Sequence, residues 1–125
     1  MNVPINLKYT QTDEWFDPAT GKLGLTDFAQ SQLSDIVFAD LVVKVGEVLQ
    51  AGKAIAAVES VKAAAESYAP FGARVVAVNE KLAANPEILN GDPYGEGWML
   101  QVEGADAAGM MDAAAYNSYC EGRAH

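Results

Sequence analysis

Short apolar and β-branched runs, separated by turn residues, make up most of this chain. Leu23 to Thr26 predicts the end of a strand, and Asp35 to Ala39 predicts a second strand that continues through Val42 to Val45. Arg74 to Val78 predicts a further strand, and Trp98 to Val102 predicts the last one. Many short strands of this kind predict a mostly β domain, built as a small barrel or sandwich.

Helices are expected at the edges of this β domain. Thr26 predicts the N-cap of a short helix over Asp27 to Leu33, whose first acidic residue suits the helix dipole. Asn85 to Leu89 carries a helix-start pattern, with Asn at the cap and Pro at the first position. Asp106 to Tyr119 is rich in alanine and predicts a C-terminal helix.

A hairpin is expected in the middle of the chain. Ala54 to Glu59 and Ala63 to Tyr68 read as its two arms, although the alanines after position 62 by themselves favour helix. Lys62 lies at the expected tip and is the only basic residue between Lys53 and Arg74. A lysine there offers an accessible primary amine on a rigid support, which suits attachment of a cofactor through an amide. The alternative is a solvated charge that protects a strand edge.

Length and charge narrow the class of protein. The 125 residues fit one domain over 1–125, with a core at about 9–103 and the terminal helix at about 106–120. The net charge of −9 argues against nucleic acid and anionic membranes as partners. No apolar run reaches the length of a membrane span, and the first residues lack the features of a presequence. We therefore expect a cytoplasmic monomer that binds no membrane.

The counts of cysteine and histidine exclude several kinds of site. Cys120 and His125 are the only residues of their types, so neither an internal disulfide nor a Cys/His zinc site can form. A nucleophile–histidine pair would have to use His125 at the extreme C-terminus. We expect no metal site and no catalytic residues, and hence a protein that is not itself an enzyme.

Several segments, in order along nearly the whole chain, resemble the glycine cleavage system H protein family. They are Tyr9 to Trp15, Gly24 to Gln30, Asp35 to Phe38, Glu59 to Ala63 and the glycine-rich loop Asn90 to Trp98. This resemblance implies the flattened β-barrel or sandwich of lipoyl and biotinyl carriers, the hammerhead type, with short helices and a C-terminal helix.

The resemblance also implies a cofactor and its attachment site. Lipoate would be bound covalently to Lys62, within a recognition segment formed by Glu59, Ser60, Val61 and Ala63. Biotin carriers usually place Met on both sides of the lysine, so Val61 and Ala63 argue against biotin. Glu59 would help a lipoyl-attaching enzyme recognise the hairpin, or else serve only as a charge that ends a strand.

The implied function is that of a non-catalytic shuttle. Lipoate would carry the aminomethyl group from a pyridoxal-phosphate glycine decarboxylase to a tetrahydrofolate-dependent aminomethyltransferase. Dihydrolipoyl dehydrogenase would then reoxidise the dithiol. In such a system the cofactor does the bond chemistry and the protein supplies position and shelter. Tethering raises the effective concentration of the cargo at each partner.

Shelter of the loaded arm is assigned by the resemblance to Thr12, Glu14 and Glu66. The loaded arm ends in a cationic amine, which an acidic, water-poor cleft would stabilise. We expect Glu14 and Glu66 to hold this ammonium group. The alternative for both is a solvated surface carboxylate.

The glycine-rich loop and a few departures from the family pattern bear on the function. The loop has no Lys-Ser/Thr and opens no helix, which argues against a phosphate cradle and favours a structural turn that packs Tyr94 and Trp98 near the arm. Asp13 stands where the family commonly has His, and Ala73 takes a usual Gly position. These departures leave two alternative functions open. One is an H-like lipoyl carrier for another pathway, such as a lipoyl relay or sulfur oxidation. The other is an unmodified interaction module.

Overall fold

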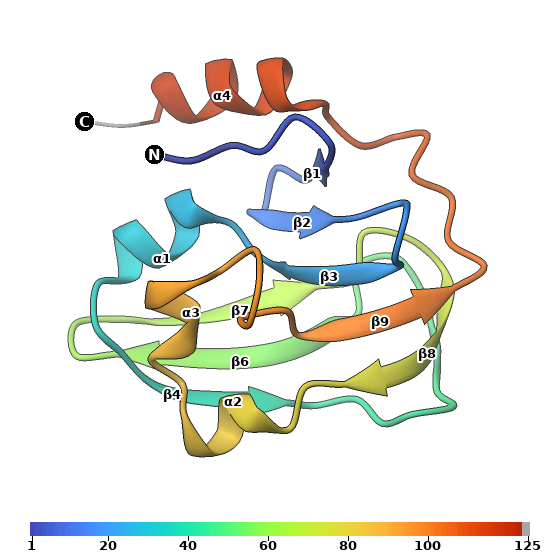
Figure 1. Ribbon diagram of the computed structural model, residues 1–125, viewed down its shortest axis with the longest axis horizontal. Helices are drawn as coiled ribbons and strands as arrows, with labels where there is room; N and C mark the ends of the chain where they lie inside the picture. The colour runs from blue at the N-terminus through green and yellow to red at the C-terminus, as the bar shows by residue number, and fades with distance from the viewer. Residues whose placement is uncertain (124–125) are drawn as a thin grey trace.

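Two antiparallel sheets enclose the core of the protein (Figure 1). The computed structural model describes residues 1–123 of the chain. The six-stranded sheet has the order β1 (Lys8–Tyr9), β2 (Glu14–Phe16), β3 (Lys22–Leu25), β9 (Leu100–Glu103), β8 (Ala73–Val78) and β5 (Val48–Leu49). The three-stranded sheet has the order β4 (Ile36–Leu41), β6 (Ala54–Ser60) and β7 (Ala64–Tyr68). The expected mostly β sandwich is confirmed.

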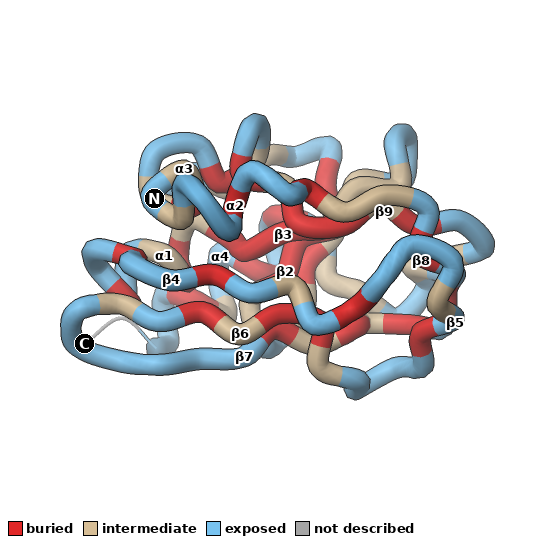
Figure 2. Tube along the Cα trace, turned by 90° about the horizontal axis from the view of Figure 1, so that it is seen from below, coloured by how far each residue is buried: buried red, intermediate tan, exposed pale blue. Residues whose placement is uncertain are grey.

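Apolar side chains from both sheets meet between them. Leu23 of β3 and Val75 of β8 come from the larger sheet, while Ile55 and Val58 of β6 come from the smaller one, and all are buried. Figure 2 shows β3 and β9 in one layer, and β6 and β7 in the other, with buried positions concentrated between them. Burial of these side chains is the main force that holds the layers together.

Four helices surround the sheets within residues 1–123: α1 (Asp27–Leu33), α2 (Lys81–Ala84), α3 (Ile88–Gly91) and α4 (Ala113–Glu121). The prediction for α1 is confirmed, because the Thr26 hydroxyl accepts a hydrogen bond from the Ala29 amide at 3.2 Å. α4 lies beside the N-terminal segment (Figure 1) and buries a second apolar cluster there, in which the Tyr9 and Tyr116 rings stack with centroids 4.6 Å apart. No helix in this part of the chain is long and apolar enough to span a membrane.

The hairpin predicted around Lys62 is confirmed as β6 and β7. Val58 pairs with Ala65, and Glu59 pairs with Ala64. The alanines therefore form strand despite their helix propensity, because cross-strand pairing outweighs a weak local preference. Gly46 and Gly52, at the turns before this hairpin, have positive φ of 91° and 89°, a backbone conformation that favours glycine.

Two strand predictions were wrong at their ends. β4 ends at Leu41 rather than Val45, because the Val42 amide makes a last bond to the Ile55 carbonyl before the chain turns near Lys44. The last strand begins at Leu100 rather than Trp98, since the Trp98 amide instead closes a turn onto Gly95. Both errors lie where the chain turns away from its strand partner, near Lys44 and between Gly95 and Trp98.

The helix predictions at Asn85 and Asp106 were wrong in position. Asn85 ends the unpredicted helix α2 by donating its amide to Lys81, and α3 begins only at Ile88. The C-terminal helix begins at Ala113, not Asp106, because Met111 exchanges two backbone hydrogen bonds with Tyr9 and stays extended. His125 lies outside the described residues.

Candidate functional site

Lys62 lies at the exposed tip of the β6–β7 hairpin, which closes at the left edge of the molecule in Figure 1. Val61 beside it is 69% exposed. Within residues 1–123 no hydrogen bond or ion pair joins the Lys62 ammonium to another side chain. The amine is thus held away from the body of the protein and is free for modification.

Ser60 organises the tip that carries this lysine. Its hydroxyl accepts hydrogen bonds from the amides of Lys62 at 3.3 Å and Ala63 at 3.0 Å, and lies 3.2 Å from the Ala63 carbonyl. The Val61 amide donates to the Asp35 carbonyl at 3.1 Å, which ties the tip to the start of β4. The turn is therefore defined by its own side chain and by one contact from the neighbouring strand.

A buried carboxylate lies at the other end of the same hairpin. Glu14 of β2 is 1% exposed. Its Oε1 accepts hydrogen bonds from the hydroxyls of Thr10 at 2.6 Å and Thr12 at 2.5 Å. Its Oε2 accepts from the Ser67 hydroxyl at 3.2 Å and the Tyr68 amide at 3.1 Å, both on β7. Glu14 therefore bridges the two sheets.

The electrostatics of this carboxylate are set by burial against neutral donors. Burial raises the pKa of Glu14, and the hydrogen bonds from Thr10, Thr12, Tyr68 and Ser67 lower it in part. No lysine or arginine forms an ion pair with Glu14 anywhere in the described chain. A buried carboxylate without a counter-ion favours the arrival of a cation.

The structure brings Thr12 and Glu14 together but does not bring Glu66 to them. Glu66 is exposed on β7 and pairs with Ala57, and strand alternation turns its side chain to the face opposite that of Ser67. Glu59 and Glu66 instead line one cavity of about 490 Å³ together with Phe38. These two acids therefore share the outer surface of the hairpin.

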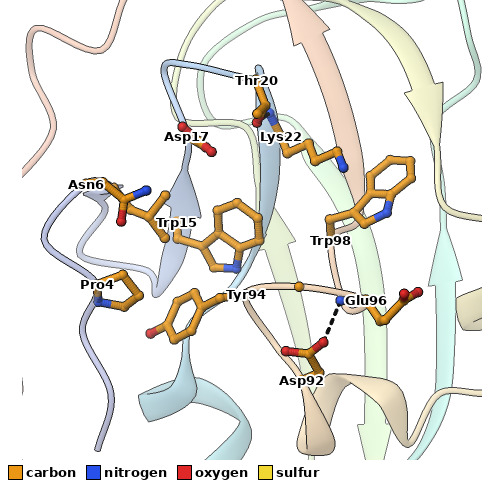
Figure 3. Close-up of a pocket in the computed structure, with 12 residues that line it drawn as sticks. Pro4, Asn6, Trp15, Asp17, Thr20, Lys22, Asp92, Tyr94, Glu96 and Trp98 are labelled. Atoms are coloured by element: carbon orange, nitrogen blue, oxygen red, sulfur yellow. Dashed lines mark hydrogen bonds between the residues drawn. The ribbon is translucent and has the colours of Figure 1, made fainter.

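The glycine-rich loop lies on the other face of the six-stranded sheet. Figure 3 shows Tyr94 and Trp98 beside Trp15, whose indole N–H donates to the Pro93 carbonyl at 3.0 Å. Trp15 follows Glu14 in β2, so its side chain points away from the buried carboxylate. The expected structural turn is present, and it lines a cavity of about 460 Å³ with Lys22. Its packing near the arm stays a prediction.

The contacts of Asp13 were not predicted from the sequence. Its carboxylate receives two hydrogen bonds of 2.8 Å from the Arg123 guanidinium and one of 2.8 Å from the Tyr116 hydroxyl. The only signal in the sequence was its departure from the family pattern. That departure does not reveal a partner 110 residues away.

Comparison with known proteins then assigns the chain to a family. The family model described as glycine cleavage H-protein matches residues 7–123. The chain belongs to the glycine cleavage H-protein family. It is 45% identical over 119 residues to the glycine cleavage system H protein of Deinococcus deserti, covering 94% of this chain and 98% of that one.

Other relatives agree with this assignment. The H protein of Bacteroides thetaiotaomicron is 42% identical over 127 residues, which cover 98% of this chain and 100% of that one. A crystal structure of the H protein of Mycobacterium marinum superposes with a TM-score of 0.85 at 32% identity, over 93% of this chain and 97% of that one. The chain is thus a carrier component of the glycine cleavage system, and a carrier for another pathway is not favoured.

Proposed function

We propose that this H-protein family member carries lipoate in amide linkage on Lys62 and shelters the loaded arm at Glu14. The observation that supports this is the position of two groups at opposite ends of the β6–β7 hairpin. Among residues 1–123, the Lys62 amine at the tip has no side-chain partner, and the buried Glu14 carboxylate of β2, at the base, has no counter-ion. When bound, lipoate supplies the dithiolane that accepts the aminomethyl group and later undergoes reoxidation.

The residues of the hairpin fit this cofactor. The Ser60 turn presents Lys62 to solvent, where a lipoyl-attaching enzyme can reach it, and Glu59 projects beside it on the exposed surface. An arm folded back along β7 would point toward Ser67 and Glu14. The protein itself supplies no catalytic residue in this proposal, only attachment, position and shelter.

The cluster around Glu14 accounts for shelter of a cationic cargo. An ammonium group that approaches Glu14 can replace the Thr12 hydroxyl as a donor, because Thr12 is exposed and its hydroxyl can turn to accept instead. The incoming charge then offsets the burial of the carboxylate. Water is largely excluded there, which slows hydrolysis of the loaded arm.

Glycine–bicarbonate carbon exchange tests the carrier role. Lipoylated protein, verified by intact mass, is combined with a glycine decarboxylase, and Lys62→Arg serves as the control that keeps the charge but cannot be lipoylated. We expect exchange with the parent and none with the control. Absence of exchange from fully lipoylated parent protein would exclude this function.

Single variants test which carboxylate shelters the arm. We expect Glu14→Gln to hydrolyse the loaded form about tenfold faster than the parent, because it removes the charge that faces the ammonium. Glu66→Gln is the matched control, since it removes one carboxylate from the other face of the strand. Equal rates for Glu14→Gln and the parent would assign shelter elsewhere.

The proposal also implies which proteins bind this carrier. Glycine decarboxylase, the aminomethyltransferase, dihydrolipoyl dehydrogenase and a lipoyl-attaching enzyme would each bind the exposed hairpin in turn. A cytoplasmic location and a monomeric state stay predictions from the sequence.

A further inference from the structure

We propose that Arg123 and Tyr116 position the Glu14 carboxylate from the C-terminal end of the chain, acting through Asp13. Asp13 precedes Glu14 in the turn between β1 and β2, so its carboxylate is one residue from the group that shelters the arm. This inference rests on the proposed role of Glu14. It makes Asp13 a positioning residue rather than one that touches the cargo.

Asp13 is the meeting point of the contacts that carry the inference. The Arg123 guanidinium donates a hydrogen bond of 2.8 Å to each carboxylate oxygen of Asp13. The Asp13 side chain is only 14% exposed, and the Arg123 side chain is 32% exposed. The Tyr116 hydroxyl donates to the same carboxylate at 2.8 Å and lies 2.6 Å from the Thr26 hydroxyl. A bidentate, partly buried pair of this kind fixes orientation as well as distance.

The backbone at Asp13 requires such support. Its φ of 72° is a left-handed conformation that costs energy for a residue other than glycine, although Asp tolerates it better than most. The Asp13 carbonyl accepts from the Thr26 amide at 3.1 Å, so the turn is held at its main chain as well. Together these contacts stabilise a turn that would otherwise relax.

This turn places the donors that cover Glu14. The Thr10 hydroxyl accepts from the Glu14 amide at 2.9 Å and donates to the Glu14 carboxylate, and the Thr10 amide bonds the Glu14 carbonyl at 3.0 Å. Relaxation at Asp13 would therefore move the hydroxyls of Thr10 and Thr12. The contacts of Glu14 to Ser67 and Tyr68 come from the other sheet and would then be strained or lengthened.

Arg123 is itself held in place by aromatic neighbours. Its guanidinium lies 4.5 Å from the centre of the Phe28 ring and 4.6 Å from that of Tyr119. The Tyr119 hydroxyl donates to the Gln11 carbonyl at 2.9 Å, within the same turn. The C-terminal segment thus contacts the turn at Gln11 and at Asp13.

Arg123→Gln tests the inference on the unmodified protein. We expect amide hydrogen exchange at Thr10 and Glu14 to rise about fivefold, while exchange at the buried Val75 amide stays unchanged. The Tyr68 amide resonance should shift, because its N–H donates to Glu14 although it lies in the other sheet. The control is Arg74→Gln, whose pair with Glu103 at 3.7 Å is more than half exposed on both sides. It should change neither readout.

Asp13→Asn provides a second variant that keeps tolerance for the left-handed backbone and an acceptor for Tyr116. We expect a smaller Tyr68 shift than in Arg123→Gln, and a double variant no more perturbed than Arg123→Gln alone. Hydrolysis of the loaded arm should rise in the same order.

An unmoved Tyr68 resonance, or exchange that rises equally at Val75, would overturn the inference. If Glu14→Gln leaves hydrolysis unchanged, the shelter proposal fails, while the Tyr68 shift still decides whether Asp13 positions Glu14.

Discussion

The Ser67 hydroxyl donates to Glu14 Oε2 at 3.2 Å and so joins the two sheets through a buried carboxylate. The two residues are 53 positions apart and are both almost fully enclosed. Because this carboxylate is buried between the sheets, the free energy of unfolding depends on whether Glu14 is protonated. The carboxylate also provides a site that a cation can enter.

The first prediction concerns the pH dependence of stability. Burial raises the pKa of Glu14 above its ordinary value of 4.5, so the folded state binds this proton more tightly than the unfolded state. The stability contributed by the protonated carboxyl is present below the ordinary pKa and is lost as pH rises through the raised one. We expect the parent to lose stability relative to Glu14→Gln as the pH rises above the ordinary pKa and through the raised one, as measured by urea denaturation.

The control for this experiment is Glu66→Gln, which removes one negative charge from an exposed position. Curves for the parent and Glu14→Gln that stay parallel over the whole range would contradict the prediction.

The second prediction concerns the turn that presents Lys62. Ser60→Ala removes the hydroxyl that binds the amides of Lys62 and Ala63. We expect lipoylation to slow by roughly threefold or more, because the tip samples other conformations, while global stability changes little. Time courses of intact mass with a lipoyl-attaching enzyme measure this effect. Ser118→Ala, at an exposed site on α4, should be modified at the parent rate.

The third prediction concerns the close approach of Gly24 and Trp15. A Cβ at position 24 would lie 2.6 Å from the indole nitrogen, so Gly24→Ala must displace the ring and its bond to Pro93. We expect a loss of about 3 kcal/mol in the free energy of unfolding, together with a shift in tryptophan fluorescence. Gly109→Ala is the matched control, because no atom of residues 1–123 lies within 4 Å of its added Cβ. Equal stabilities for the two variants would refute this packing.

The fourth prediction concerns Asn90, which connects α3 to the start of β4. Its side chain accepts from the Ile36 amide at 2.9 Å and donates to the Ser34 carbonyl at 2.7 Å. Asn90→Ala should cost about 1–2 kcal/mol in unfolding free energy. Exchange of the Val61 amide, which bonds Asp35 nearby, should also quicken.

Asn117→Ala is the control for that change, since Asn117 is exposed on α4. A Val61 amide that exchanges at the parent rate in Asn90→Ala would show that this connection does not reach the hairpin tip.

The sequence by itself determined the local elements. The cap at Thr26 and the turns at Gly46 and Gly52 follow from preferences that act over a few residues. The hairpin that carries Lys62 was visible in the sequence as well, but its alanines form strand only through cross-strand pairing. Most strands were likewise visible in their apolar pattern, which is why the sandwich could be predicted, but β1 and β2 were not predicted as strands.

The tertiary structure alone decided which acids share a site. Glu14 and Glu66 looked equivalent in the sequence, but only Glu14 became buried, between its own turn and β7 of the other sheet, which supplies two of its four donors. The delayed start of α4 depends on pairing of Met111 with Tyr9, and the ion pair of Asp13 depends on Arg123. Contacts between segments so distant in the chain arise from packing of whole layers, which no local pattern records.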